Sequence, residues 1–267
     1  MQDHADIAAF SSEELRASPE ERRRWLLERL RRDGRLVAAV LARELDTSED
    51  TIRRDLRELA AAGMVQRVHG GALPPSPALL PFTVRRERST AAKERLAAEA
   101  VKLVRPDQVI LLDGGTTNLA LARLLPPALR LTVVTPSPAI AVALAEHPGA
   151  EVIVLGGRVD KASQSVASAV ALTAAQAIQV DLCILGVCSL AAEVGVSVAG
   201  YEEAELKRVM VAHARDVAAI VTADKLGTVA PFVVGPVEIL HRIVTEREAP
   251  QHALDAIAAR GVEVLRV

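Results

Sequence analysis

The sequence is poor in aromatic residues, which make up only 2% of its 267 positions. Ala, Val, Leu and Ile must therefore fill any core. Long apolar runs are also missing, since stretches such as Val109–Leu112 and Val152–Leu155 are strand-length and far short of the ~20 residues of a membrane span. The N-terminal residues Met1–Asp6 lack the basic start and apolar run of a signal peptide. We therefore expect a cytoplasmic protein with no membrane partner.

Cysteine is scarce as well. Cys183 and Cys188 are the two cysteines, and both fall in or beside an apolar stretch. We interpret them as buried, reduced thiols rather than as a disulfide or a metal site. No cluster of His and Cys has metal-ligand spacing elsewhere, so we expect neither a metal nor a cofactor.

Positive charge is unevenly distributed along a chain of net charge −2. Between Arg22 and Leu73 there are twelve arginines and eight acidic residues, so this span is basic and the remainder is acidic. A basic segment on an acidic protein suits contact with phosphates, while the acidic bulk discourages indiscriminate binding.

Prolines mark a boundary between two domains. Residues 74–81 read Pro-Pro-Ser-Pro-Ala-Leu-Leu-Pro, which cannot continue a helix or a central strand and indicates a semi-rigid linker. We predict an acidic N-terminal tail at 1–17, a DNA-binding domain at 18–73, the linker at 74–81 and an α/β domain at 82–267.

The N-terminal domain has the pattern of a winged helix-turn-helix. Ser18-Pro19-Glu20-Glu21 is a strong helix start, and that helix ends at Gly34. Val37, Val40, Leu41 and Leu45 predict a second helix. Ser48 caps a third, whose apolar stripe is Ile52, Leu56, Leu59 and Ala60. Residues 64–69 then resemble a strand that runs into a Gly-Gly turn, the wing.

The C-terminal domain alternates strands and helices. We predict strands at 109–112, 131–134, 151–155, 181–187, 217–222, 239–245 and 262–266, and helices at about 89–104, 117–125, 138–146, 168–178, 200–214 and 251–260. This alternation favours a mostly parallel sheet covered by helices.

The third helix presents a basic face opposite its apolar stripe. Arginine on a helix in the major groove can pair with guanine or contact phosphates. The predicted DNA-binding residues are Ser48, Thr51, Arg53, Arg54 and Arg57 on this helix, with Arg67 and His69 on the wing. The alternative is that Asp50–Arg54 and Arg54–Glu58 are ordinary ion pairs on a solvated face; the two preceding helices and the following hairpin favour DNA binding.

The run from Ser48 to Leu56, followed by Gly63 and by Arg67-Val68-His69-Gly70-Gly71-Ala72, closely resembles the DeoR family of regulators of sugar metabolism. The resemblance extends over about residues 20–267. It implies binding to a double-stranded DNA operator, usually repression, and release by a phosphorylated sugar or related metabolite. It makes Thr51, Arg53 and Arg54 the strongest candidates for DNA contacts from the recognition helix. Val37 stands where the family usually has a Ser or Thr cap, and Asp46 where Gly is usual.

A second candidate site follows the strand Val109–Leu112. Asp113-Gly114-Gly115-Thr116-Thr117 joins this strand to a helix N-terminus, where free N–H groups and the helix dipole favour an anion. An ordinary β-to-α turn is the alternative. Other strands also end in polar turns, and ligands lie at the carboxyl ends of such strands. The predicted effector-binding residues are Asp113, Gly115, Thr116, Thr117, Thr135, Ser137, Arg158 and Lys225.

The family pattern continues through this domain at Asp113, Gly115-Thr116-Thr117, Gly156-Gly157, Glu203-Ala204, Lys207 and Lys225. The resemblance implies a sensor domain similar in fold to ribose-5-phosphate isomerase. The chain departs from the pattern at Pro136, where Asn is usual, at Ala167-Ser168, where Gly-Pro is usual, and at Val187–Leu190. These departures bear on the identity of the ligand.

Two other functions compete with a ligand-responsive regulator. In the first, the C-terminal domain only oligomerises and binds no effector. In the second, the chain is a sugar-phosphate isomerase, but the loop after Gly186 offers Cys188, Ser189 and the more distant Glu193 and no acidic pair for proton transfer. We therefore predict a non-enzyme. We also predict a homo-oligomer, a dimer or tetramer, because one winged helix covers only a few base pairs.

Overall fold

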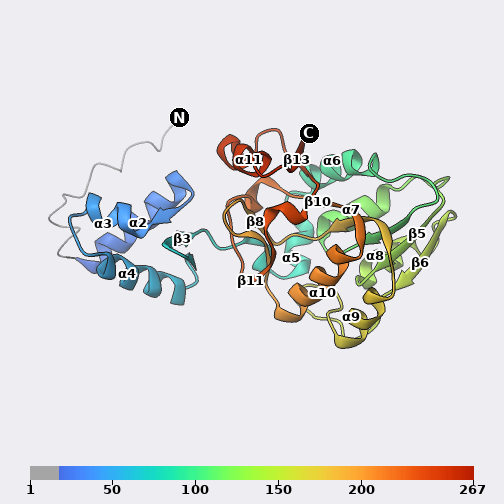
Figure 1. The fold of residues 1–267 in the computed structure, drawn as a ribbon, viewed down its shortest axis with the longest axis horizontal. Helices are drawn as coiled ribbons and strands as arrows, with labels where there is room; N and C mark the ends of the chain where they lie inside the picture. The colour runs from blue at the N-terminus through green and yellow to red at the C-terminus, as the bar shows by residue number, and fades with distance from the viewer. Residues whose placement is uncertain (1–17) are drawn as a thin grey trace. The chain divides into compact units, whose positions relative to one another are not determined.

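The structure is a computed structural model that describes residues 18–267; the predicted tail at 1–17 lies outside the described residues. The described residues fold as two compact units, which divide between Pro75 and Ser76 (Figure 1). The division falls inside the proline-rich segment. Within the described residues, no helix is long and apolar enough to cross a membrane.

The N-terminal unit is a winged helix-turn-helix, as predicted. Its elements are α2 (Pro19–Asp33), β1 (Leu36–Val37), α3 (Ala38–Glu44), α4 (Glu49–Ala61), β2 (Gln66–Val68) and β3 (Gly71–Leu73). The strands form an antiparallel sheet in the order β1-β3-β2. The side chain of Ser18 accepts a hydrogen bond from the Glu21 N–H, which caps α2, and Gly34 ends that helix with a φ of +71°. Leu26, Ile52 and Leu56 lie in its buried core.

Val37 and Asp46 are the two positions of this unit at which the chain departs from the DeoR pattern. Val37, predicted to lie in the second helix, instead pairs with Gly71 in the sheet and precedes α3 without a side-chain cap. Asp46 adopts a φ of +45°, in the left-handed region where glycine carries no steric cost. A glycine at position 46 would relieve that cost, which accounts for the usual residue.

The C-terminal unit is an α/β domain built on a parallel sheet, again as predicted. The sheet contains β4 (Val109–Leu112), β5 (Leu131–Thr135), β6 (Ala150–Val154), β7 (Val180–Leu185), β10 (Ala214–Ile220), β12 (Arg242–Thr245) and β13 (Glu263–Arg266). Its order is β13-β12-β10-β7-β4-β5-β6, and each neighbouring pair is parallel. The chain runs outward from β4 to β6 and then returns to place β7 on the other side of β4, so the direction of winding reverses between β4 and β7.

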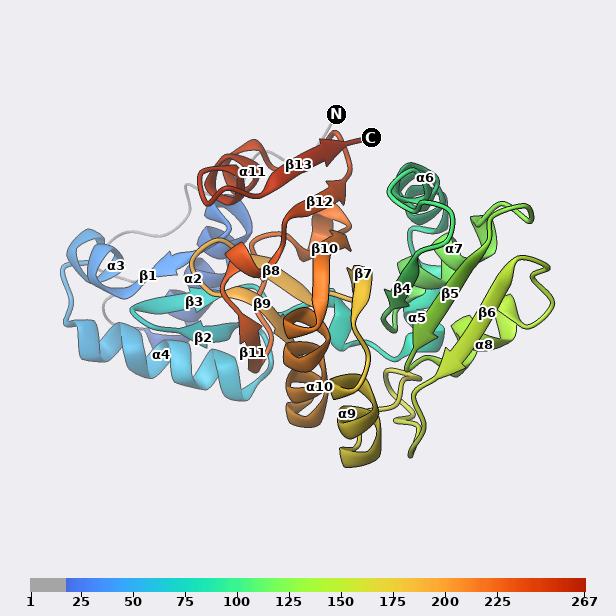
Figure 2. The ribbon, with the colours of Figure 1, turned by 45° about the vertical axis from the view of Figure 1, so that its right-hand side comes forward.

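Helices cover both faces of this sheet (Figure 2). One face packs against α5 (Phe82–Glu87), α6 (Thr90–Val101), α7 (Thr116–Leu124) and α8 (Pro138–Leu144). The other packs against α9 (Ala169–Gln176), α10 (Tyr201–Ala212) and α11 (Gln251–Ala258). Alternate residues of a strand serve the two cores: Ile110 and Leu112 face the first, and Leu111 the second.

The sequence patterns missed a second, smaller sheet. Strands β8 (Ser189–Ala191), β9 (Gly195–Val198) and β11 (Phe232–Gly235) pair antiparallel in the order β11-β9-β8. Short 3₁₀ helices lie at η1 (Pro77–Leu79), η2 (Ala223–Lys225) and η3 (Val237–Ile239). Cys183 is buried, as expected, whereas Cys188, also expected to be buried, is only partly so; both are free thiols.

Candidate functional site

The exposed face of α4 carries the residues that the sequence predicted to contact DNA. Ser48 caps this helix: its Oγ accepts a hydrogen bond from the Thr51 N–H at 3.1 Å and lies 2.9 Å from the Thr51 Oγ1. Arg53 is exposed and pairs with Glu49 at 2.6 Å and with Asp50 at 3.6 Å. Arg54 and Arg57 are exposed and make no ion pair or hydrogen bond with any residue of 18–267. These two arginines are therefore free to contact a phosphate or a base edge.

The two ion pairs that were the alternative to DNA binding do not form among the described residues. Neither Asp50–Arg54 nor Arg54–Glu58 pairs within the described residues; Glu58 pairs with Arg23 of α2. On the wing, Arg67 in β2 and His69 beside the turn are both exposed. The helix start, its free arginines and the wing thus form one candidate DNA-contacting surface within the N-terminal unit.

A buried ion pair holds α4 against α2. The Arg22 Nε lies 2.5 Å from the Asp55 Oδ2, and a second Arg22 nitrogen lies 3.2 Å from the Asp55 Oδ1. Both side chains are almost completely buried. The pairing fixes the rotation of α4, and with it the direction in which Arg54 and Arg57 point.

The candidate ligand site is a cavity of about 640 Å³ in the C-terminal unit. Its wall includes the loops that follow β4, β7 and β10, which are adjacent strands of the sheet. It therefore lies at the carboxyl ends of the strands, where the winding reverses between β4 and β7. Ligands of open α/β sheets bind at such a switch point.

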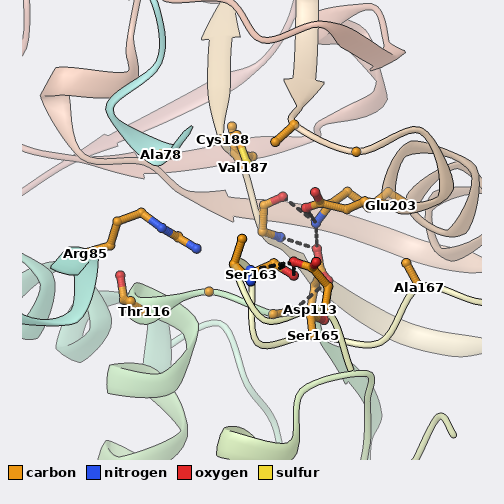
Figure 3. A pocket seen from close by; sticks show the side chains of 18 of the residues that line it. Ala78, Arg85, Asp113, Thr116, Ser163, Ser165, Ala167, Val187, Cys188 and Glu203 are labelled. Atoms are coloured by element: carbon orange, nitrogen blue, oxygen red, sulfur yellow. Dashed lines mark hydrogen bonds and ion pairs between the residues drawn. The ribbon is translucent and has the colours of Figure 1, made fainter. Parts of the chain in front are cut away.

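Asp113, directly after β4, holds this end of the sheet together. Its Oδ1 accepts from the Gly114 N–H at 2.7 Å, and its Oδ2 accepts from the Gly186 N–H at 2.8 Å and from the Lys207 ammonium. Burial alone would lower the pKa of Lys207, but the Asp113 and Glu203 carboxylates outweigh it and raise that pKa above its ordinary value. Figure 3 shows Asp113 and Glu203 converging from opposite sides of this network.

The loop geometry around Asp113 explains its glycines. A Cβ on Gly186 would lie 2.1 Å from the Gly114 carbonyl oxygen, so no side chain fits there. Gly115 adopts a φ of +145°, which disfavours residues with a side chain. Gly115 is the N-cap residue of α7 and offers no side-chain cap, so the first N–H groups of this helix are available to a ligand.

Polar and cationic side chains surround the start of α7. Thr116 and Thr117 line the cavity, and the buried Oγ1 of Thr117 has no hydrogen-bond partner in the described part of the chain. Lys225 lines it too and donates to the Val187 carbonyl at 2.8 Å. Burial, with the positive charge of Arg85, lowers the pKa of Lys225 despite the nearby Cys188 and Asp224. Figure 3 shows Arg85 extending from α5 toward the centre of the cavity, above Thr116.

Six of the eight predicted effector-binding residues therefore line one cavity. They are Asp113, Gly115, Thr116, Thr117, Arg158 and Lys225. Thr135 and Ser137 are not among the lining residues; both are buried, and the Thr135 Oγ1 accepts from the Ser137 N–H at 3.1 Å. The Thr135 hydroxyl at the end of β5 therefore stabilises the turn that follows this strand.

Sequence reasoning missed several lining residues. Arg85 belongs to no motif, and its neighbours Arg86 and Arg88 look the same in the sequence. Ser163 and Ser165 lie in an irregular loop, and Ala78, Leu79 and Leu80 fall in the segment interpreted as a linker. Glu203 and Lys207 belong to the family pattern in the sequence. Their ion-pair network with Asp113 could not be predicted, because α10 and the end of β4 are distant in the sequence.

Comparison with known proteins identifies both units. Residues 22–77 match the DeoR-like helix-turn-helix domain, and residues 88–247 match the DeoR C-terminal sensor domain. The HTH-type transcriptional regulator GolR of Listeria innocua is 32% identical over 86% of this chain and 91% of its own. The putative aga operon transcriptional repressor of Escherichia coli is 30% identical over 96% and 97%, and the glycerol-3-phosphate regulon repressor of Escherichia coli is 25% identical over 91% and 97%.

Solved structures give more distant likenesses. Ribose 5-phosphate isomerase A of Methanocaldococcus jannaschii has a TM-score of 0.37 at 18% identity, over 50% of this chain and 52% of that one. The full-length sorbitol operon regulator SorC of Klebsiella pneumoniae has a TM-score of 0.42 at 14% identity, over 90% and 100%. Neither likeness assigns a ligand or an activity. On the two matched domains and the similarity to GolR, the chain belongs to the DeoR family of transcriptional regulators, with an N-terminal DNA-binding domain and a C-terminal sensor domain.

Proposed function

We propose that this regulator is a repressor of a carbohydrate-related operon and that a small phosphorylated sugar, or a similar polyol phosphate, weakens its binding to DNA. Relatives named as repressors of an aga operon and of a glycerol-3-phosphate regulon support the carbohydrate assignment. The isomerase alternative has no support from relatives that are named as regulators. A sensor domain that only oligomerises stays an untested alternative.

The observation that carries the proposal is the combination of positive charge and a helix start at the switch point of the sheet. Lys225 and Arg85 line the cavity and pair with no carboxylate of the described residues. The uncapped first turn of α7 adds N–H donors, and Thr117 adds a hydroxyl that has no hydrogen-bond partner among residues 18–267. These groups suit the phosphate of a ligand.

The rest of the cavity suits a polyol. Ser163, Ser165 and Arg158 line it on the loop after β6, and hydroxyl and guanidinium groups bond sugar hydroxyls. Asp113 lines it too, but its oxygens already accept bonds from two backbone N–H groups and Lys207. We therefore assign to Asp113 the positioning of Lys207 and the two loops, in place of the direct contact to sugar hydroxyls that the sequence suggested.

Thr116→Asp tests the site. The change places a carboxylate where the phosphate should bind, at the first residue of α7, a position where an acidic side chain suits the helix dipole. Calorimetry of the full chain against triose, pentose and hexose monophosphates should show binding to the wild type and none to this variant. Thr90→Asp is the matched control, because Thr90 is the exposed first residue of α6, and it should bind like the wild type. If no sugar phosphate binds the wild type at millimolar concentration, the proposal is wrong.

A further inference from the structure

The first residues of the sensor unit form part of the cavity wall. Ala78, Leu79 and Leu80 line the cavity, and they follow within five residues of Pro75, the last residue of the DNA-binding unit. We call residues 76–80 the connecting segment. Its backbone is continuous with the DNA-binding unit, so a change in its position reaches that unit through the chain itself.

Hydrogen bonds anchor the connecting segment to the loop after β7. The buried Ser76 hydroxyl donates to the Cys188 carbonyl at 2.5 Å and accepts from the Ala78 N–H at 3.0 Å. The neighbouring carbonyl, that of Val187, accepts from the Lys225 ammonium. The connecting segment and Lys225 therefore hold the same two-residue stretch of the cavity wall.

Arg85 makes the second anchor. Its Nε donates to the Leu80 carbonyl at 2.9 Å, and its guanidinium lies 5.7 Å from the centre of the Phe82 ring. A guanidinium has five N–H donors, so the group retains donors for a ligand. Figure 3 shows its nitrogens directed into the cavity, with Ala78 on the segment nearby. One side chain thus contacts both the connecting segment and the space for a ligand.

We infer that Arg85 binds the anionic group of the ligand beside Lys225 and the start of α7, and that its bond to Leu80, with the bond of Ser76 to Cys188, transmits occupancy to the connecting segment. This inference rests on the proposed function for the nature of the ligand. A ligand changes DNA binding only if it binds two arrangements of the protein with different affinity. The position of the connecting segment distinguishes the two arrangements. An anion that binds the Arg85 guanidinium fixes this side chain, and the hydrogen bond from Arg85 then holds Leu80 in a single position.

The test uses the full chain and inorganic phosphate as the probe. Phosphate at millimolar concentration should raise the melting temperature of the wild type and slow the hydrogen exchange of backbone amides in residues 76–80. Arg85→Gln should weaken phosphate binding about tenfold or more, the loss of one charged contact of about 1.4 kcal/mol. Arg86→Gln is the matched control, because Arg86 is the next residue of α5 and is exposed; it should bind phosphate like the wild type.

Ser76→Ala separates transmission from binding. This variant keeps Arg85 and Lys225, so it should bind phosphate nearly as tightly as the wild type, but the exchange of residues 76–80 should respond much less. The inference is overturned if Arg85→Gln binds phosphate as the wild type does, or if phosphate binds the wild type without slowing exchange in this segment. Sugar phosphates that release DNA while residues 76–80 stay unaffected would refute the inference and leave the proposed function standing. Protection of residues 76–80 by phosphate, with no sugar phosphate altering DNA binding, would refute the proposed function instead.

Discussion

The Lys207 ammonium and the Asp113 carboxylate form an ion pair in which both side chains are at least 96% buried. The pair joins α10 to the end of β4, and Glu203 lies 3.3 Å from the same ammonium. Lys207 also donates to the Gly186 carbonyl at 2.9 Å, which ties in the loop after β7. The wall of the cavity is therefore assembled around one buried charge pair.

Asp113→Asn should destabilise the sensor unit, because it leaves the buried Lys207 charge with Glu203 as its one carboxylate among the described residues and with the Gly186 carbonyl. Removing one member of a buried ion pair costs about 3–5 kcal/mol of unfolding free energy. Urea unfolding followed by circular dichroism measures the loss. Asp255→Asn, at an exposed position of α11, should change little. Asp113→Asn/Lys207→Met should lose less than the two single changes combined; simple additivity would mean that the two groups do not act as a pair.

Lys93 should make a contribution to the stability of the sensor unit that increases between pH 8 and pH 10. Burial, together with Lys225 and Arg85 and against the pull of Asp224, lowers the pKa of Lys93 from 10.5 to about 8. In this window Lys93 binds its proton more fully in the unfolded chain than in the folded one, so this residue makes the free energy of unfolding increase with pH. Lys225, whose pKa is also lowered, acts in the same direction. Burial raises the pKa of the Cys183 and Cys188 thiols, which act in the opposite direction. The contribution of Lys93 is therefore measured as the difference in pH slope between the wild type and Lys93→Gln, and equal slopes of the two proteins would contradict the assignment.

In the DNA-binding unit, Asp55→Asn should lower the free energy of unfolding by about 3–5 kcal/mol, because it removes the negative charge that pairs with the buried Arg22 guanidinium. Trp25 is the chain's single tryptophan and packs on the core of this unit, so its fluorescence follows this unit alone. Asp50→Asn is the control: its side chain is 90% exposed, and surface pairs contribute about 0–1 kcal/mol. Equal effects of the two changes would argue against a structural role of the buried pair.

Arg53→Ala and Arg54→Ala should each weaken DNA binding, and at least one should relax the sequence preference. Loss of a bidentate contact to guanine costs about 1–3 kcal/mol, whereas loss of a phosphate contact lowers affinity evenly and reduces the salt slope by about one unit. Arg54 has no partner among residues 18–267, whereas Arg53 must leave Glu49 to reach DNA, so Arg54→Ala should have the larger effect. Anisotropy on specific and scrambled duplexes distinguishes the roles, with the exposed Arg123→Ala as the control. Wild-type affinity in both α4 variants would exclude this helix from recognition.

Local sequence signals predicted the elements with strong ends or apolar runs. Ser18 and Ser48 are caps in the structure as in the sequence. Central strands such as β4 are short apolar runs bounded by turn residues, which identifies them. Strands such as Ser189–Ala191 are only three residues long, which is too short for a period to be visible. The small antiparallel sheet was missed for this reason.

The cavity was predictable only in part. The glycine turn before Thr116 indicates a helix start without any knowledge of the rest of the fold. The part of the cavity at the start of α7 could therefore be predicted from the local sequence. Arg85 and the connecting segment reach the cavity through tertiary packing alone. Four prolines in eight positions indicated an extended linker, yet Ser76 caps a 3₁₀ helix there and is buried against Cys188. No local pattern specifies that a proline-rich segment will pack into a neighbouring wall.

The most direct test of the account is the affinity of the full chain for DNA, with and without sugar phosphates. A duplex selected by the protein from random sequence would be titrated by fluorescence anisotropy at fixed salt, since affinity for DNA depends steeply on salt. We predict tight, sequence-dependent binding that a sugar monophosphate weakens in the wild type and leaves unchanged in Thr116→Asp. Sequence-dependent binding that no sugar phosphate alters, or a ligand effect that persists in Thr116→Asp, would contradict it.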